Sequence, residues 1–352
     1  MERPETTTVG TEKTDPYRLA GVDTKKGERL VDWLKNEKRS ANNEKYGQVF
    51  SGIGGFAALF RPNFSMFADP LLISCTDGVG TKLLLGIENQ EISNLGLDLV
   101  AMCVNDLYTL GGIPLFFLDY FASGSLSSEQ FKQVLKGIHE GLSQCDAALV
   151  GGETAELPGL YQKNHFDLSG FMVGVVDGAN KWGPEKVKEG DILIGLESSG
   201  FHSNGYSLIR SWLKKSPCEK GLIKKLLRPT RIYQEVLQAK SQAPDGAIHA
   251  CAHITGGGLS ENLPRIIPNK LVAKIEKRQI PTPAWMKDFI LANAEKLETM
   301  YPVFNMGLGM ILAVEASWYK NVLEIFNELG APAHKLGEVC TRKRQGPDLI
   351  YV

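Results

Sequence analysis

The chain has 352 residues, 43% of them hydrophobic and 22% charged, a composition that supports a sizeable core and favours two domains over one. Its 39 Lys and Arg nearly balance its 40 Asp and Glu, so no overall basic field exists to recruit nucleic acid or an anionic membrane. The six cysteines lack the close spacing of a zinc or dithiol redox site, which favours free thiols in a reducing cytosol.

The composition of the N-terminal region does not predict a targeting signal. Residues 1–16 are polar and threonine-rich, and they predict a disordered tail without a signal-peptide core. No apolar run in the chain reaches the roughly 20 residues that span a bilayer, so we expect a cytoplasmic protein. Spaced apolar residues among charges predict a short amphipathic helix over residues 27–38.

The first chemical motif is a glycine-rich segment. Leu71-Leu72-Ile73 predicts a strand that runs directly into the loop Thr76-Asp77-Gly78-Val79-Gly80-Thr81-Lys82. The glycines let a ligand approach the backbone, Lys82 can neutralise phosphate, and Asp77 can hold a divalent cation. The spacing is not that of a Walker A loop, so an ordinary glycine turn remains open for this segment alone.

A predicted helix over residues 94–110 contains acids in an apolar setting. Asp98 and Asn105 are seven positions apart and share a face, and Asp106 lies about 100° further round the helix. Buried acids carry a desolvation cost unless they face solvent, a partner or a metal. Helix capping or solvent exposure is the alternative to a metal site.

A capping box at Ser127 and Gln130 predicts the next helix, which ends near residue 144, and a strand follows over residues 147–150. Gly151-Gly152-Glu153-Thr154-Ala155-Glu156 is expected to form a flexible loop at the end of that strand, a common position for ligand-binding residues. Glu153 thereby joins Asp77 and Asp106 as a candidate magnesium ligand, although spacing alone does not bring the three together.

The domain boundary is expected near residue 179. A strand over residues 166–176 precedes the turn-forming residues Asp177 to Asn180. Beyond them, strands are expected at 191–196 and 307–314, and helices at 205–213 and 318–329. We predict an α+β protein of two mixed domains, residues 17–178 and 179–352.

Two polar loops mark the second half. Ser198 to Gly205 joins a strand to a helix and could hold a phosphate at the helix N-terminus, and His202 within it could transfer a proton. The alternative for His202 is a capping or surface residue. His253-Ile254-Thr255-Gly256-Gly257-Gly258 presents consecutive backbone amides before a helix, unless it is a plain flexible turn.

Together these segments resemble the aminoimidazole ribonucleotide synthetase family in its stand-alone bacterial form, over residues 17–352. The resemblance rests on runs in family order: Ala20 to Asp23, Gly52 to Phe56, Thr76 to Lys82, Asp98 to Asp106, Gly151 to Gly159, His202 to Ser207 and Thr255 to Gly258. The Thr76 loop also occurs in related ATP-dependent enzymes, whereas the runs beginning at Asp98, Gly151 and His202 are more specific.

The resemblance implies two α+β domains, with the N-terminal domains of two subunits pairing their sheets into a β-barrel and ATP bound in grooves beside that interface. A homodimer is therefore expected. It also implies that ATP phosphorylates the amide oxygen of formylglycinamidine ribonucleotide. An internal nitrogen then closes the ring, which gives aminoimidazole ribonucleotide, ADP and phosphate in purine biosynthesis.

Individual site residues are implied in the same way. Asp77, Asp106 and Glu153 would bind Mg²⁺, and Lys82 with its adjoining glycines would steady the ATP phosphates. The implied ATP-contacting set is Thr76, Asp77, Gly78, Gly80, Lys82, Asp98, Gly151 and Gly152. The implied catalytic set is Asp106, Glu153, His202 and Asn204, and the implied substrate-binding set is Ser203, Thr255, Gly256 and Gly257.

Two rival interpretations have to be weighed. One is another ATP enzyme of the superfamily: formylglycinamidine synthetase, selenophosphate synthetase or thiamine-phosphate kinase. The chain length and the run beginning at His202 argue against these. The other is a nucleotide-binding scaffold or maturation-complex subunit that keeps the fold without catalysis.

Overall fold

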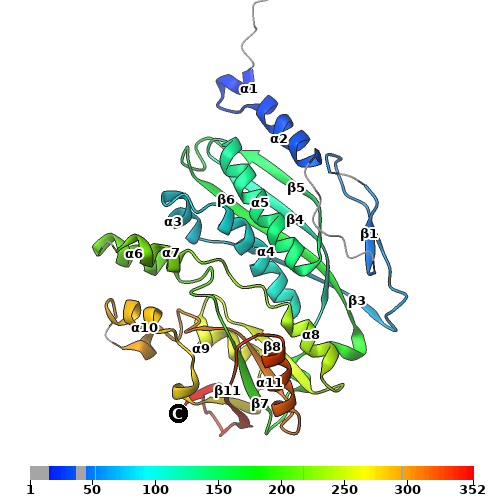
Figure 1. The fold of residues 1–352 in the computed structure, drawn as a ribbon, viewed down its shortest axis with the longest axis vertical. Helices are drawn as coiled ribbons and strands as arrows, with labels where there is room; N and C mark the ends of the chain where they lie inside the picture. The colour runs from blue at the N-terminus through cyan, green and yellow to red at the C-terminus, as the bar shows by residue number, and fades with distance from the viewer. Residues whose placement is uncertain (1–15, 37–44, 52, 217, 295) are drawn as a thin grey trace, which may run out of the picture.

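The computed structural model describes residues 16–36, 45–51, 53–216, 218–294 and 296–352. They form two α/β halves, each built on one mixed sheet (Figure 1). Residues 1–15 of the predicted tail and Gly52 lie outside the described residues, and Pro16 begins the short helix α1 (Pro16–Leu19). Helix α2 (Thr24–Asn36) confirms the amphipathic helix, whose last two predicted positions also lie outside.

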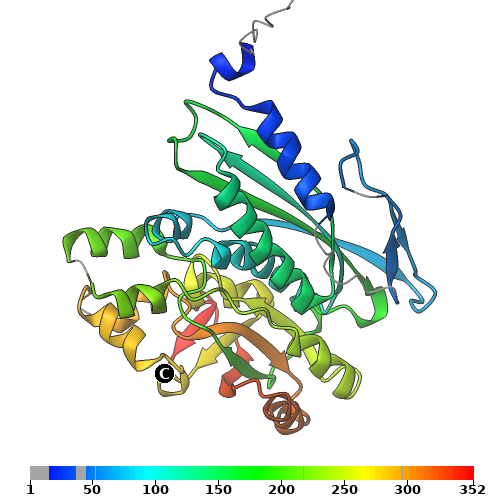
Figure 2. The same ribbon diagram turned by 45° about the horizontal axis from the view of Figure 1, so that its top comes forward.

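The N-terminal half is a four-stranded sheet in the order β3-β6-β4-β5. Its strands are β3 (Pro70–Gly78), β4 (Ile113–Ser123), β5 (Ala148–Glu156) and β6 (Phe166–Asp177). Only β4 and β5 are parallel, as expected for strands joined by a crossover helix. Helices α4 (Ser93–Tyr108) and α5 (Ser128–Cys145) lie on one face of this sheet (Figures 1 and 2).

Both long helices were predicted from sequence. Ser127 caps α5, because its hydroxyl accepts from the backbone N–H of Gln130, as the capping box indicates. The two helices pack unusually closely: a Cβ on Gly96 would lie 2.0 Å from the Val134 carbonyl oxygen, and one on Gly137 would lie 1.8 Å from the Ser93 carbonyl oxygen. Only glycine at these two positions permits the observed backbone contact.

Two strands run further than the sequence predicted. Strand β3 continues through Asp77 to Gly78, so the loop itself is only residues 79–81. Strand β5 continues to Glu156, and the expectation of a flexible loop over residues 151–156 is wrong. These residues pair in register with β4, with Glu153 opposite Tyr120. Ladder hydrogen bonds outweigh the local turn preference of the glycine pair.

The sheet face away from α4 and α5 is apolar and open. On β3, Ile73 faces the helices and is buried, whereas Leu72 on the other face keeps 66% of its surface exposed. Phe171 on the neighbouring β6 is 46% exposed. Side chains alternate between the two faces of a strand, and Leu72 and Phe171 lie on the same face. Their exposure is therefore a property of that face of the sheet.

The C-terminal half is a six-stranded sheet in the order β12-β9-β11-β7-β10-β8. Its strands are β7 (Ile192–Glu197), β8 (Ile248–His253), β9 (Leu271–Ile275), β10 (Leu308–Val314), β11 (Ala333–Thr341) and β12 (Leu349–Tyr351). Strands β8 and β10 are buried along their whole length. Unlike the N-terminal sheet, this sheet is therefore covered on both faces from β7 to the edge strand β8.

Helices accompany this sheet. They are α6 (Tyr206–Lys215), α7 (Lys220–Leu226), α8 (Glu235–Gln242), α9 (Gly258–Asn262), α10 (Ala284–Leu291) and α11 (Tyr319–Glu328). The predicted strands at 191–196 and 307–314 and the predicted helices at 205–213 and 318–329 are confirmed as β7, β10, α6 and α11, with bounds within two residues.

The remaining elements are short. They are α3 (Lys82–Glu88), the paired strands β1 (Gly47–Val49) and β2 (Phe60–Pro62), and the 3₁₀ turns Gly178–Asn180, Pro184–Lys186, Leu263–Ile266, Lys277–Gln279 and Leu297–Met300. The sheets of the described chain are open, and within one copy none closes into a barrel. Among the described helices, none is both long enough and apolar enough to cross a bilayer.

Candidate active site

Helix α4 is held against the second half of the molecule by the segment between α7 and α8. The Asn105 side-chain amide donates to the Arg231 carbonyl at 2.8 Å, and its oxygen accepts from the Tyr233 backbone N–H at 3.1 Å. Asp98 Oδ1 accepts from the backbone N–H of Thr230 at 2.6 Å. The polar residues of this otherwise apolar helix therefore anchor the two halves to each other.

Lys82 forms an ion pair inside the protein. Its Nζ lies 2.8 Å from Asp98, both side chains have no exposed surface, and Nζ also donates to the Arg228 carbonyl at 2.7 Å. Burial lowers the pKa of Lys82, and the charge of Asp98 opposes that shift. The sequence expectation had Lys82 facing phosphate, whereas here its charge is matched by Asp98.

An acidic corner forms where β3 meets the C-terminal end of α4. Asp106 is half-exposed, and its Oδ1 lies 2.8 Å from Nδ1 of the buried His253. Asp77 is close by: burial and the charge of Asp106 raise its pKa, while His253 and a hydrogen bond from the Gly78 N–H oppose the rise. Two carboxylates with this mutual repulsion are a donor set suited to Mg²⁺.

The loop that follows Asp77 reaches the second half. Gly80 has φ +65°, a left-handed conformation that glycine adopts without strain. Thr81 Oγ1 lies 3.0 Å from Ser207 Oγ at the start of α6. Thr76, one residue before Asp77, is exposed on the other face of the sheet. The structure thus separates Thr76 from Asp77 although they are adjacent in sequence.

His202 is fully buried and held in a strained backbone conformation. Its φ is 58°, an uncommon value outside glycine, and a Cβ on Gly309 would lie 2.6 Å from its ring. Burial, with smaller contributions from His253 and Lys82, lowers its pKa well below the usual value. Because Nε2 accepts from the Ser199 N–H at 3.4 Å, the ring proton is on Nδ1, and that buried N–H has no partner among the described residues.

The neighbours of His202 form the wall of the same corner. Ser203 Oγ lies 2.9 Å from the Thr230 hydroxyl, which itself donates to Asp98 at 2.7 Å, so the Ser203 hydroxyl is the donor. Asn204 lies against the glycine loop, 3.6 Å from where a Cβ of Gly256 would be. Its side-chain nitrogen is buried without a partner in the described chain.

The loop Thr255 to Gly257 is braced from behind. Asn262 donates to the Gly256 carbonyl at 3.0 Å and to the Gly258 carbonyl at 2.8 Å, and it accepts from the Thr255 hydroxyl at 3.3 Å. Gly257 has φ +89°, which favours glycine. The carbonyls of this loop are therefore turned toward Asn262.

Glu153 is not brought to the acidic corner within one chain. The register aligns Gly152 and Asp119 with Gly170 and Asp77 in one row, so Glu153, the next residue, points to the opposite sheet face. Three strand spacings of about 4.8 Å separate β5 from β3, roughly 14 Å in all. Packing within the sheet explains why residue 152 is a glycine, because a Cβ there would lie 2.2 Å from Asp119 Oδ1.

Two residues of the site were given no role of their own by the sequence prediction. His253 ends β8, and its Nδ1–H donates to Asp106, which leaves Nε2 as a buried acceptor without a partner among the described residues. Thr230 joins Asp98 to Ser203. His253 lies two residues before Thr255, at the start of the motif that contains the glycine loop, so its position was a usable signal. Nothing in the sequence around Thr230 indicates its role, because its partners are 132 and 27 positions away.

A cavity among the described residues lies away from this corner. It has a volume of about 630 Å³ and is lined by residues that include Tyr108, Trp182 and Lys240. Lys240 donates to the Gly111 carbonyl at 2.7 Å and lies over the Trp182 ring, and burial lowers its pKa to about 8. None of the predicted site residues lines this cavity. The candidate active site is instead an open corner between the two halves.

Two family models match the chain. AIR synthase related protein, N-terminal domain, covers residues 57–176, and AIR synthase related protein, C-terminal domain, covers residues 188–350. Together they span more than half of the sequence. The chain belongs to the AIR synthase family.

Curated relatives of this AIR synthase family member extend the match to nearly the whole chain. A phosphoribosylformylglycinamidine cyclo-ligase of Coxiella burnetii (strain RSA 493 / Nine Mile phase I) is 44% identical over 94% of both chains. One of Clostridium tetani (strain Massachusetts / E88) is 41% identical over 94% of this chain and 98% of its own. The similarity therefore includes both halves and the segment that joins them.

Solved structures confirm a mixed α/β AIR synthase-like fold. Thiamine-monophosphate kinase from Stenotrophomonas maltophilia K279a superposes with a TM-score of 0.66 at 18% identity, covering 92% of this chain and 94% of its own. Hydrogenase maturation protein HypE in complex with ATP gives a TM-score of 0.61 at 15% identity, covering 84% of each chain. At these identities the likeness shows the fold alone.

Proposed function

We propose that this protein is a phosphoribosylformylglycinamidine cyclo-ligase, which uses ATP to close formylglycinamidine ribonucleotide into aminoimidazole ribonucleotide in purine biosynthesis. The observation that carries the proposal is 41–44% identity to enzymes of that name over 94% of the chain. The fold is shared with kinases and maturation proteins, so fold alone does not select this activity.

The proposed chemistry has two steps. The amide oxygen of the substrate attacks the γ-phosphorus of ATP, the bond to the β–γ bridging oxygen breaks, and ADP leaves. The amidine nitrogen then attacks the activated carbon, loses a proton, and expels inorganic phosphate together with the former amide oxygen. An amide oxygen is a poor leaving group, whereas phosphate leaves readily, so the protein mainly holds the reacting groups at attack distance.

The unpaired polar atoms of the corner support this chemistry. His202 is neutral because burial lowers its pKa, and its free Nδ1–H suits the amide oxygen. His253 Nε2 is a free acceptor and suits an amidine N–H. The side-chain nitrogen of Asn204 suits the transferred phosphoryl group. In this assignment Asp106 keeps His253 in the required tautomer, and Ser203, Thr255, Gly256 and Gly257 contact the ribonucleotide through their backbone amides.

Asp77 and Asp106 are the proposed Mg²⁺ ligands in one subunit. Burial, and to a smaller extent the charge of Asp106, raises the pKa of Asp77, and a bound cation would favour the ionised form of both carboxylates. Magnesium would neutralise the charge on the phosphates of ATP. Glu153 lies on the other sheet face, so we assign it as a ligand contributed from a second copy of the chain.

ATP is proposed to lie along the ends of β3 and β5. Its contacts would be Thr76, Asp77, Gly78 and Gly80 from one subunit, with Gly151 and Gly152 from the other. We assign Lys82 and Asp98 to positioning, because their buried ion pair fixes the end of the loop against α4. The phosphates would then meet backbone N–H groups and Mg²⁺ rather than the lysine charge.

We further propose domains 17–178 and 179–352 and a homodimer in which the N-terminal sheets complete a β-barrel. The open apolar face around Leu72 and Phe171 supports the dimer, because an apolar sheet face of this kind is normally covered. A cytoplasmic location suits an enzyme that consumes ATP.

The test is ring closure itself. Purified protein is incubated with Mg²⁺, ATP and formylglycinamidine ribonucleotide, and ADP is measured alongside the aromatic amine product, with controls that omit one component each. We expect one ADP for each ring closed. ADP without ring closure would move the assignment to another ATP enzyme of this fold, and ATP binding without turnover would indicate a scaffold.

A further inference from the structure

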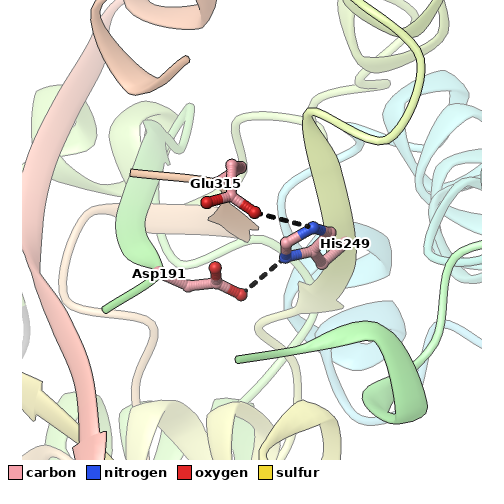
Figure 3. Close-up of side chains that lie close together, drawn as sticks. All are labelled: Asp191, His249 and Glu315. Atoms are coloured by element: carbon pink, nitrogen blue, oxygen red, sulfur yellow. Dashed lines mark hydrogen bonds and ion pairs between the residues drawn. The ribbon is translucent and has the colours of Figure 1, made fainter. Parts of the chain in front are cut away.

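Three ionisable side chains meet far from the candidate active site, at the other end of the C-terminal sheet. Asp191 precedes β7, His249 lies near the start of β8, and Glu315 follows β10 (Figure 3). Their nearest polar atoms all lie within 4.8 Å of one another. His249 is four residues before His253 on β8, about 13 Å along the strand from the acidic corner.

Asp191 fixes the tautomer of His249. Its Oδ2 lies 2.7 Å from His249 Nδ1 and also accepts from the Lys188 backbone N–H at 2.9 Å. Both side chains are buried, with 2% and 5% of their surface exposed. An ionised carboxylate only accepts hydrogen bonds, so Nδ1 carries the ring proton and Nε2 presents a lone pair.

That lone pair points toward another acceptor. His249 Nε2 lies 3.6 Å from Glu315 Oε2 (Figure 3), too far for a hydrogen bond and close enough for two lone pairs to repel. A positive charge between them removes the repulsion. Two ligands bound to one zinc ion at about 2.1 Å with tetrahedral geometry lie roughly 3.4 Å apart, which is close to this separation.

We propose that His249 Nε2 and Glu315 form a binding site for a divalent transition-metal cation of the zinc class. Asp191 hydrogen-bonds the far side of the imidazole, the arrangement common to metal-ligating histidines. Water completes the coordination. An imidazole with one carboxylate selects zinc, cobalt or nickel over magnesium. Lys188 Nζ lies 3.4 Å from Glu315 but keeps 66% of its side chain exposed, so it can swing into solvent when the ion binds.

The bound ion would join three segments that are distant in sequence, the entry to β7, the start of β8 and the exit of β10. A ligand that binds only the folded state stabilises it by mass action. Thermal unfolding therefore reports on this site without any assay of ring closure.

The experiment uses full-length, tag-free protein carrying Asp106→Asn, which weakens the carboxylate site at the other end of the sheet. Zinc is titrated by calorimetry with millimolar magnesium present throughout, and Tm is recorded with and without zinc. We expect one zinc ion per chain and a raised Tm. Glu315→Gln, at the surface end of the cluster, should weaken zinc binding at least about tenfold and abolish the rise in Tm.

Glu328→Gln is the matched control, because it removes the same charge from an exposed position on α11. It should leave zinc binding unchanged. Equal zinc affinity in Glu315→Gln, or no binding of zinc at sub-millimolar concentration by the unsubstituted cluster, overturns the proposal. In the second case the hydrogen bond between His249 and Asp191 accounts for the cluster without a metal.

Discussion

Helix α4 carries two aspartates eight positions apart whose surroundings differ completely. Asp98 has no exposed surface, and its Oδ1 accepts hydrogen bonds from Lys82 and Thr230, while Oδ2 lies 2.8 Å from Lys82 Nζ as an ion pair. Asp106, near the end of the same helix, is 39% exposed and touches one buried histidine. The fold uses the first carboxylate to join its two halves and leaves the second free for a ligand. An acid in an apolar helix is thus ambiguous until its partners are known.

The largest effect is expected at the buried pair. Lys82→Met leaves Asp98 charged and uncompensated, so the free energy of unfolding should fall by about 3–5 kcal/mol, measured by urea denaturation. Adding Asp98→Asn removes the unpaired charge and keeps an acceptor for Thr230, so the double variant should recover part of the loss. A loss below about 1 kcal/mol in Lys82→Met would show that Asp98 does not depend on this cation.

Asp106→Asn should give the opposite pattern. The amide oxygen still accepts from His253, so the free energy of unfolding should change by less than about 0.5 kcal/mol. The proposed Mg²⁺ site would lose a charged ligand, so kcat should fall about 100-fold. Steady-state ring closure and urea denaturation measure the two quantities on one preparation, with Glu324→Gln as an exposed control. Near-normal turnover would show that Asp106 is not a ligand in the active site.

Asp119 extends the comparison to a buried acid that no cation of the described residues compensates. Burial raises its pKa from 3.8 to about 7, so the folded state holds a proton that the unfolded state releases between those values. The contribution of Asp119 to the free energy of unfolding is complete below about pH 4 and is lost as the pH rises to about 7. The full loss is about 1.4 kcal/mol for each unit by which the pKa is raised.

The test for Asp119 is the difference in unfolding free energy between pH 5 and pH 8. Asp119→Asn cannot ionise, so it should remove a few kcal/mol of that difference and be more stable than the unsubstituted protein at pH 8. The same pH dependence in both proteins would mean that Asp119 is ionised in the fold.

The smallest effect is expected at Ser203. Its hydroxyl donates to Thr230 at the edge of the Asp98 network, so Ser203→Ala should lower the free energy of unfolding by about 1 kcal/mol. Because that hydroxyl is engaged within the protein, KM for the ribonucleotide should stay within about twofold. A large rise in KM would mean that the hydroxyl turns to the substrate.

The sequence alone determined most of the local structure. Apolar periodicity correctly predicted α4, and the Ser127 cap together with that periodicity predicted α5, because both signals act over a few residues. The sequence motifs identified the family, because their order along the chain can be read without knowledge of the fold. Local signals could not predict where β5 ends. Its pairing with β4 continues past Gly151-Gly152 and outweighs the turn preference of these glycines.

Only the tertiary structure decided which chemical groups are available. Lys82 lies 16 positions from Asp98, and His253 lies 147 positions from Asp106, yet each pair is within 2.8 Å. The same packing withdraws Lys82 from solvent, adds His253 to the corner and turns Glu153 to the other sheet face. Charge, burial and tautomer depend on neighbours brought together by long-range packing, and residue type alone cannot specify them.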